Sequence, residues 1–300
     1  MGCIMSFTHL SHRESEAIGI IREAVVESSN AVVLFSGGKD STVLAHLTVK
    51  AFYPAKPPIP LLLVDSTWEF NDVIAFRDAF AAANEFELRT HVNEEGRREG
   101  LNPIDHGATY TTMMRTDALK QALDLGGYDV ILGGARRDEE ASRAKERIVS
   151  VRGKEHSWDP KNQRPELWSI YNFRRSPEQT LRVYPLSNWT EQDLWAYIFF
   201  NRIELCPLYF AAPRPVVEHN GNLIVVDQPE QAKRFQFGPI RTMGVRFRSL
   251  GCWPVTAAAK SSASDLGAVL QETFSARISE RNGRVGDGSS LEAQKREGYF

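Results

Sequence analysis

The sequence predicts an α/β fold: an open, parallel, five-stranded sheet with helices on both faces, followed by a small C-terminal extension made of a hairpin and a helix. Two observations lead to this prediction. Short apolar segments alternate with longer segments of helical periodicity through the first two-thirds of the chain, which is typical of a parallel sheet covered by helices. Past Pro207 the pattern changes to turn residues, arginines and a polar tail.

The first part of the chain supplies three strands of this pattern. Ile18 and Val25 share one face of a helix predicted at 11–29, and Ser11 with Glu14 fits a capping box at its start. The segments that follow are predicted to be a strand at 31–35, a helix from 42, a strand at 61–64, a helix at 69–83 and a strand at 86–92.

The middle of the chain completes the sheet. It is predicted to form a polar loop at 93–108, a helix at 111–125, a strand at 128–132, an irregular loop at 156–168 and a last sheet strand at 180–184. His156, in the irregular loop, is interpreted as a surface histidine rather than a catalytic base. Thr190 is the predicted N-cap of the next helix, and Asp193 at the third helical position completes a capping box.

The same patterns predict two domains, a nucleotide-binding domain at 1–212 and a C-terminal extension at 213–300. Residues 211–215 read as a linker between them. Asn220-Gly221 between two apolar runs is a strong hairpin signal. A helix is expected at 266–278, and the glycine-rich tail after it is polar enough to be partly disordered in isolation.

Composition excludes several classes of protein. Apolar residues make up 42% of the chain and charged residues 25%, as in ordinary globular proteins. The net charge of −2 provides no general basic field of the kind that nucleic-acid binders use. No apolar run approaches the roughly 20 residues of a membrane span. Three widely separated cysteines form no metal-ligand spacing and no disulfide framework, so the cytoplasm is the expected location.

A glycine loop between the first strand and the next helix is the main candidate for a ligand site. Backbone N–H groups at a helix N-terminus, together with the helix dipole, favour anions, and glycine lets a phosphate approach closely. The loop fits neither a Walker A motif nor a dinucleotide fingerprint, because the required glycine spacings are missing. Its six residues are Ser36, Gly37, Gly38, Lys39, Asp40 and Ser41.

Arginines gather after a later strand, where ligands of open α/β sheets bind. Arg136 and Arg137 follow a glycine pair after one intervening residue and are interpreted as anion ligands, since guanidinium groups bind phosphate and sulfate in bidentate fashion. Arg143, Lys145 and Arg147 fit a solvated helix equally well.

Several segments together resemble the small catalytic subunit of the bacterial two-subunit ATP sulfurylases, within the superfamily of PP-loop ATP pyrophosphatases. They are FSGGKDSTVLAHL, GGARRDEEASRAKERI, HSWDPKNQRPELW, VYPLSNWTEQDLW, RFRSLGCWPVT and the terminal REGYF. The resemblance implies that ATP and sulfate give adenosine 5′-phosphosulfate and pyrophosphate, the first step of sulfate assimilation. It also implies a GTPase partner related to elongation factors, possibly fused to a kinase, and Mg²⁺ with the ATP, but no metal cluster, flavin or NAD.

The resemblance also suggests roles for the candidate residues. Ser36, Gly37, Gly38, Asp40 and Ser41 would hold the β- and γ-phosphates, with Asp40 as a turn-former or Mg²⁺ contact and the role of Lys39 open. Asp65 and Thr67 would contact the nucleoside. The expected clamp on sulfate and the transition state consists of Arg136, Arg137, Arg246 and Arg248.

Three alternatives stay open at this point. An adenylylsulfate or phosphoadenylylsulfate reductase would share the loop but needs a redox cysteine near the C-terminus, where Cys206 and Cys252 stand unpaired in sequence. A tRNA-modifying PP-loop enzyme would call for cysteines or a basic appendage. A non-enzymatic scaffold is disfavoured by the intact glycine loop.

Overall fold

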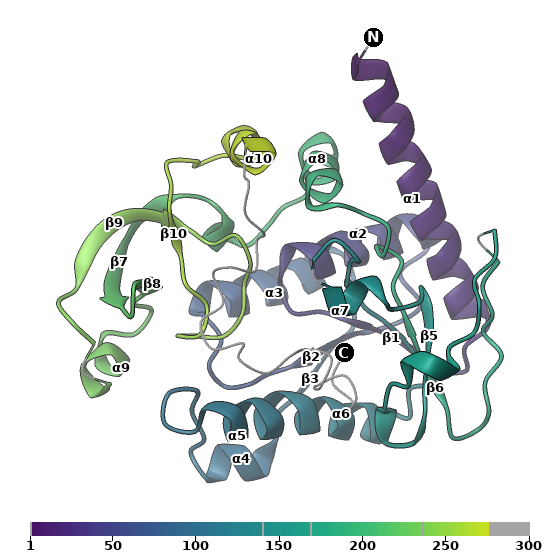
Figure 1. Cartoon of the computed structure of the whole chain (residues 1–300), viewed down its shortest axis with the longest axis horizontal. Helices are drawn as coiled ribbons and strands as arrows, with labels where there is room; N and C mark the ends of the chain where they lie inside the picture. The colour runs from purple at the N-terminus through teal and green to yellow at the C-terminus, as the bar shows by residue number, and fades with distance from the viewer. Residues whose placement is uncertain (1, 140, 169, 236, 276–300) are drawn as a thin grey trace.

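The computed structural model describes residues 2–139, 141–168, 170–235 and 237–275, and it contains two sheets (Figure 1). The larger sheet has six strands in the order β3-β2-β1-β4-β6-β5. Its strands are β1 (Ala31–Leu34), β2 (Leu61–Val64), β3 (Leu88–His91), β4 (Val130–Leu132), β5 (Val149–Arg152) and β6 (Thr180–Val183). Five of them are parallel, as predicted.

The predicted strand count is wrong by one, because β5 pairs antiparallel with β6 at the edge of the sheet. This strand lies between the basic residues at 136–147 and the irregular loop at 156–168, where no strand was predicted. Its two polar side chains, Ser150 and Arg152, are fully buried, with Glu146 and Tyr184 as partners.

Helices cover both faces of the large sheet, as predicted (Figure 1). On one face lie α1 (Gly2–Val26), α2 (Lys39–Phe52) and α3 (Asn71–Ala83), whose apolar residues join Val33, Leu132 and Val183 in the main core. On the other face, α6 (Ala118–Gly126) packs Leu119 and Leu123 against Val32 and Ile131. The remaining elements of this part are α4 (Glu94–Arg98), α5 (Gly107–Thr111), a π-helical segment (Thr112–Asp117), α7 (Ala141–Ala144), α8 (Glu191–Asn201) and 3-10 turns at Lys154–His156, Pro160–Asn162 and Pro207–Tyr209.

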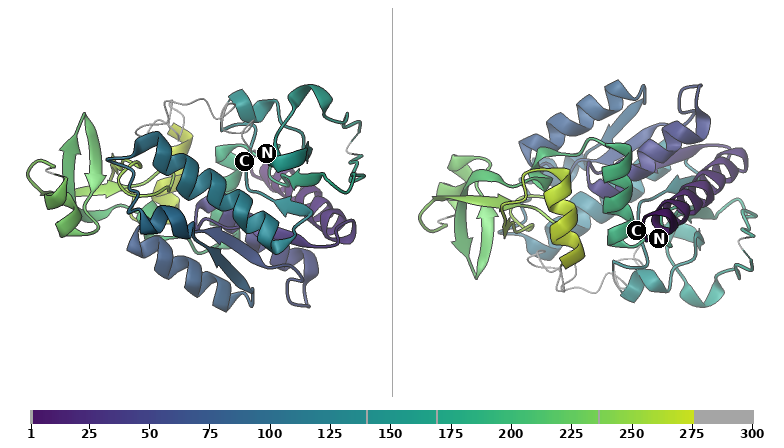
Figure 2. Two further views of the ribbon diagram at one scale, coloured as in Figure 1. Left: turned by 90° about the horizontal axis from the view of Figure 1, so that it is seen from below. Right: turned by 90° about the horizontal axis from the view of Figure 1, so that it is seen from above.

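The smaller sheet is antiparallel, with the order β10-β9-β7-β8. It consists of β7 (Ala212–His219), β8 (Asn222–Val225), β9 (Arg241–Arg246) and β10 (Ala259–Lys260), accompanied by α9 (Pro229–Arg234) and α10 (Leu266–Ser275). Figure 2 shows this sheet projecting to one side of the larger one. The two parts meet where Trp68 stacks on Trp253, with ring centroids 5.7 Å apart, and where Phe70 meets Phe247 edge-on at 5.1 Å.

Local signals in the sequence have mixed outcomes. The capping box of Thr190 and Asp193 is confirmed, and so is the hairpin turn, where Asn220 and Gly221 have φ values of 50° and 75°. The cap at Ser11 is wrong, because α1 already begins at Gly2.

Two further predictions are corrected. The linker at 211–215 is wrong from Ala212 onward, since these residues pair with β9 despite two prolines. His156 is not at the surface: only 6% of it is exposed, and its ring nitrogens contact Asp124 and Thr180. The predicted tail and the end of the helix at 266–278 lie outside the described residues. The domain boundary at residue 212 stays a prediction.

Candidate active site

The glycine loop stands at the carboxyl edge of β1, directly before α2. Gly37 has φ of 70°, and a side chain there would place its Cβ 3.1 Å from Val73 Cγ1, so this position requires glycine. Gly38 is the N-cap of α2 and offers no side chain to cap the helix. The first-turn amides therefore depend on other partners, and the amide of Lys39 donates to the Tyr209 hydroxyl at 2.8 Å.

Two serine hydroxyls meet in this loop. Ser36 is exposed at the end of the strand, and its Oγ lies 3.3 Å from Ser41 Oγ on the first turn of α2. Ser41 Oγ also donates to the Gly38 carbonyl at 2.9 Å. The predicted phosphate-binding hydroxyls thus lie side by side.

Asp40 is held between two buried cations. Lys39 Nζ lies 2.9 Å from one carboxylate oxygen, and Arg136 Nε lies 2.6 Å from the other. The side chains of Lys39 and Arg136 are 1% and 0% exposed. Burial alone would raise the pKa of the Asp40 carboxyl, but the charges of Lys39 and Arg136 outweigh it and hold that pKa well below its usual range. We call these three residues the Asp40 cluster.

This arrangement decides how Asp40 fits the expected Mg²⁺. Both carboxylate oxygens already accept from a cation, which opposes a further divalent ion at the same oxygens. The part of the chain that the structure describes also contains no group of three His, Cys, Asp or Glu able to hold a metal ion. The donor set therefore does not fit a protein-held Mg²⁺, and a metal ion that arrives with ATP would depend on phosphate oxygens.

Gly134 brings the segment after β4 into backbone contact with the glycine loop. A Cβ at Gly134 would lie 2.9 Å from the carbonyl carbon of Asp40 and 3.0 Å from the amide nitrogen of Ser41. Sequence reasoning did not single out this residue, although its place after a strand in a Gly-Gly pair was a signal for close approach. It also missed Tyr209, whose position beside the loop no local pattern could indicate.

Asp65 and Thr67 lie at the same edge of the sheet, at the end of the neighbouring strand β2. Thr67 has φ of 66°, and its amide donates to Asp65 Oδ1 at 2.7 Å. Arg77 forms an ion pair with the other Asp65 oxygen at 3.6 Å. Thr67 is exposed, which leaves its side chain accessible at this edge.

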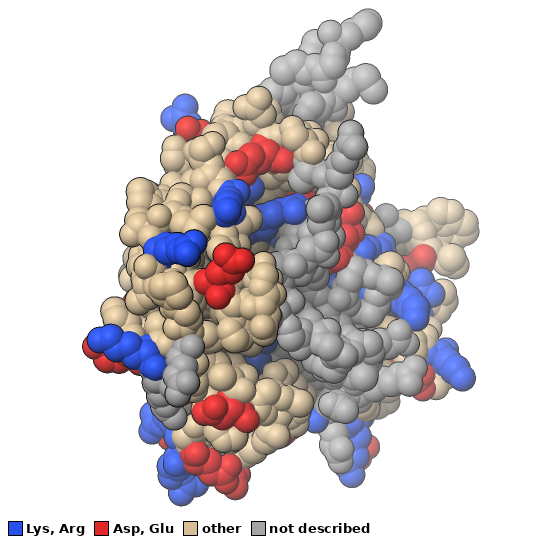
Figure 3. All heavy atoms as spheres, turned by 60° about the vertical axis from the view of Figure 1, so that its left-hand side comes forward, with Lys and Arg blue, Asp and Glu red and all other residues tan. Residues whose placement is uncertain are grey.

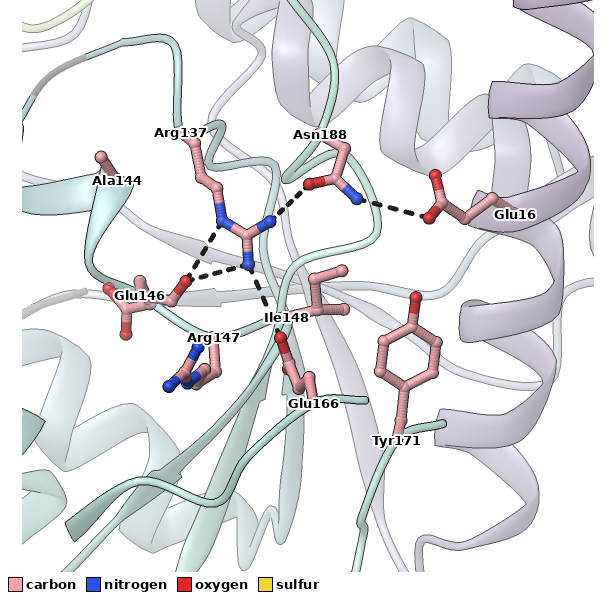
Figure 4. A pocket seen from close by; sticks show the side chains of 9 residues that line it. All are labelled: Glu16, Arg137, Ala144, Glu146, Arg147, Ile148, Glu166, Tyr171 and Asn188. Atoms are coloured by element: carbon pink, nitrogen blue, oxygen red, sulfur yellow. Dashed lines mark hydrogen bonds and ion pairs between the residues drawn. The ribbon is translucent and has the colours of Figure 1, made fainter. Parts of the chain in front are cut away.

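Arg137 lines a polar cavity of about 320 Å³ (Figure 4). Its guanidinium contacts Asn188, the Glu146 carbonyl at 3.3 Å and the Glu166 carboxylate at 3.6 Å. Burial raises the pKa of Glu166. The cavity is lined by Glu16, Arg137, Ala144, Glu146, Arg147, Ile148, Glu166, Tyr171 and Asn188.

The two C-terminal arginines also separate. Arg246, at the end of β9, is buried and pairs with Glu272 of α10 at 2.8 Å. Arg248 pairs with Glu191 at 3.2 Å. The amide of Glu191 donates to Asp138 at 2.9 Å, and Asp138 lies 3.5 Å from Arg136 Nη1. The structure therefore links Arg248 to Arg136, while it directs Arg137 and Arg246 elsewhere.

Cys206 and Cys252 are both buried. Cys252 is 1% exposed and packs with Leu101, Tyr110 and Met114. Burial raises the pKa of the Cys206 thiol to about 11. Neither thiol is exposed, as a redox cysteine usually is.

Comparisons with known proteins agree on one family. The model of the phosphoadenosine phosphosulfate reductase domain matches residues 30–258. Sulfate adenylyltransferase subunit 2 of Chromohalobacter salexigens and that of Acinetobacter baumannii are each 54% identical to this chain, over 98% of it and 97% of the relative. The Geotalea daltonii protein of the same name is also 54% identical, over 98% of this chain and 99% of its own length.

The alignments with these relatives extend over 98% of the chain, from the glycine loop to the smaller sheet. The chain therefore carries a phosphoadenosine phosphosulfate reductase domain and belongs to the sulfate adenylyltransferase subunit 2 family.

Proposed function

We propose that this chain is the catalytic subunit of a two-subunit sulfate adenylyltransferase. It transfers AMP from ATP to sulfate, giving adenosine 5′-phosphosulfate and pyrophosphate. The observation that carries this proposal is the meeting of the loop at 36–41 with Gly134 and Arg136 at one sheet edge. The relatives, all named for sulfate as acceptor, support the choice of sulfate.

The chemistry joins one anion to a polyanion. A sulfate oxygen forms a bond to the α-phosphorus while the bond from that phosphorus to the bridging oxygen breaks, and pyrophosphate leaves with the electron pair. Sulfate carries no proton that must be removed, so the protein contributes position and positive charge rather than a base. The Asp40 cluster places two cations, Lys39 and Arg136, beside the loop at 36–41, and positive charge at that point favours a polyanion.

Roles for the individual residues follow from this arrangement. In the proposal, the hydroxyls of Ser36 and Ser41 and the amides of the loop hold the departing pyrophosphate, and Asp65 with Thr67 holds the nucleoside. Arg136 is the candidate catalytic arginine, and its link through Asp138 and Glu191 makes Arg248 a candidate positioning residue. Arg137 and Arg246 would support the surrounding loops through their own ion pairs.

The partner and the location are also proposed. The designation "subunit 2" in the relatives' names supports a second subunit, and the motif resemblance suggests a GTPase whose hydrolysis of GTP drives the unfavourable synthesis.

ATP and GTP are both available in the cytoplasm, where we place the reaction. No described helix is long and apolar enough to cross a membrane. Figure 3 shows acidic and basic side chains interspersed on the face that it draws.

Product analysis tests the proposal. The full chain, with and without a GTPase partner, is given Mg-ATP and sulfate, and the nucleotides are identified by mass. Adenosine phosphosulfate and pyrophosphate that depend on sulfate, and increase with partner and GTP, are expected. AMP and pyrophosphate without dependence on sulfate would indicate a different acceptor. ADP and phosphate would overturn the assignment of the glycine loop.

A further inference from the structure

The antiparallel pair β5–β6 buries two guanidinium groups on one face of the large sheet. Ser150 is paired with Arg182, and Arg152 with Thr180. Because side chains alternate between the faces of a sheet and paired residues share a face, Ser150, Arg152 and Arg182 lie on the same side. Arg152 and Arg182 are both 0% exposed. This is the face that α6 covers near the neighbouring strand β4.

Both terminal nitrogens of the Arg152 guanidinium have protein partners on this face. Its Nη2 lies 2.6 Å from Glu146 Oε1 and 3.2 Å from the Tyr184 hydroxyl, and its Nη1 donates to Ser150 Oγ at 3.3 Å. Ser150 in turn donates to the same Glu146 oxygen at 2.9 Å. The one buried carboxylate of the group therefore already neutralises Arg152.

Arg182 differs, because none of its three guanidinium nitrogens has a hydrogen-bond partner among the described residues. Burial, and then the charge of Arg152, lowers the pKa of Arg182 to about 10, so the group stays charged at neutral pH. Asp124, on α6, is held by His156 at 2.9 Å. Tyr184 is neutral, since burial raises its pKa to about 12. Two buried cations thus share one buried carboxylate.

We infer that Arg182 and Arg152 form a binding site for a small tetrahedral oxyanion of the sulfate and phosphate class. A buried charge without a partner is strongly unfavourable, and the fork of guanidinium donors matches two oxygens of such an anion. The Nε of Arg152 also lacks a partner among the described residues, so both arginines have donors to offer. This inference rests on the buried charges and does not depend on the proposed function.

The place of the site in the fold leaves two sources for the anion. Val183, next to Arg182, accepts from the Gly133 amide at 2.8 Å, so the site lies just below the edge where the glycine loop stands. The anion is either the sulfate that reacts or a resident ion that completes the fold. Both sources involve the same chemistry, and the experiment separates them.

Equilibrium dialysis of the full chain against radiolabelled sulfate, at constant ionic strength, tests the site. Arg182→Met keeps the unbranched stem and removes the charge, and its fold is checked by circular dichroism and urea unfolding. We expect this variant to bind sulfate roughly ten- to hundredfold more weakly. Unlabelled phosphate should compete and chloride should not. Arg89→Met, a change of a partly exposed arginine on β3, is the control and should leave binding unchanged.

Equal sulfate affinity of Arg182→Met and the unaltered chain would overturn the inference, as would no sulfate binding by the unaltered chain. So would a loss of stability in Asp124→Asn that disappears in the Arg182→Met background, because Asp124 would then be the partner of Arg182.

Adenylyl transfer measured on the same proteins separates the two sources of the anion. A reacting sulfate makes transfer depend on Arg182, whereas a resident ion leaves transfer intact at saturating sulfate. Adenylyl transfer without Arg182-dependent sulfate binding would refute this inference alone. Arg182-dependent sulfate binding without adenylyl transfer would refute the proposed function alone.

Discussion

The Asp40 cluster and the β5–β6 face both bury positive charge, but they neutralise it differently. In the Asp40 cluster one carboxylate receives two cations, Lys39 at 2.9 Å and Arg136 at 2.6 Å. On the β5–β6 face Glu146 receives Arg152, and Arg182 has no hydrogen-bond partner among the described residues. The Asp40 cluster contains its own carboxylate between the two cations. On the β5–β6 face, by our inference, an anion from outside the protein supplies the missing negative charge.

The comparison also explains why arginines close together in sequence behave differently. Arg136 and Arg137 are neighbours, yet one closes the glycine loop and the other lines the cavity beside α1. Which carboxylate each arginine meets depends on contacts far away in the chain, and those contacts decide whether its charge is available to a ligand.

The largest expected effect comes from Asp40→Asn, which would leave two buried cations without their carboxylate. The free energy of unfolding should fall by about 3–5 kcal/mol, measured by urea unfolding. The variant would then resemble the β5–β6 face, and added phosphate should restore part of the lost stability. Asp78→Asn, which removes the more exposed ion pair of Arg77, is the control and should cost less than about 1 kcal/mol. Equal losses in the two variants would contradict the comparison.

Gly134→Ala tests the backbone contact that holds the Asp40 cluster together. Its Cβ would overlap the Asp40 backbone at 2.9 Å, and relief of such overpacking typically costs about 1–3 kcal/mol of stability. We also expect weaker binding of ATP, followed by calorimetry. Gly19→Ala on α1, where no atom lies within 4 Å, should instead stabilise the protein by about 0.5–1 kcal/mol. If Gly134→Ala left the stability unchanged, the segment after β4 and the glycine loop would not require this close contact.

The pH dependence of stability probes the charge of Arg182 through His156. Burial, and then the charge of Arg182, lowers the pKa of His156, so below about pH 6.5 the unfolded chain takes up a proton that the folded chain resists. Stability should therefore fall as the pH drops below about 6.5, and less steeply in His156→Gln. Saturating sulfate should flatten the slope of the unaltered chain, because the bound anion offsets Arg182.

Urea unfolding at a series of pH values measures this slope. The exposed His219, changed to Gln, is the control and should leave it unaltered. A slope that is identical with and without sulfate would argue against an anion near Arg182.

The smallest effect is expected for Glu191→Gln, which breaks the ion pair with Arg248 at 3.2 Å. Both side chains are about one-fifth exposed, at 17% and 21%, so stability should fall by no more than about 1 kcal/mol. Glu85→Gln, which breaks the well-exposed pair with Lys56, is a matched surface control. A loss from Glu191→Gln as large as that from Asp40→Asn would mean that Arg248 belongs to the buried charges of the site.

The sequence by itself determined the features that depend on neighbours along the chain. Five parallel strands, the glycine loop before α2, the capping box at Thr190 and the hairpin at Asn220-Gly221 were all predicted and found. Each depends on residues within one turn or one strand, where the period of apolar residues and the conformational freedom of glycine limit the possible structures.

Only the tertiary structure decided which charged side chains are buried and which partners they meet. Strand β5 was missed because Ser150 and Arg152 can be buried only with Glu146 and Tyr184 beside them. The burial of His156 likewise needs Asp124, 32 residues away. Burial of a charge costs least where a partner is present, and partners such as Tyr184 and Asp124 come from other elements of the fold, which no local pattern in the sequence can specify.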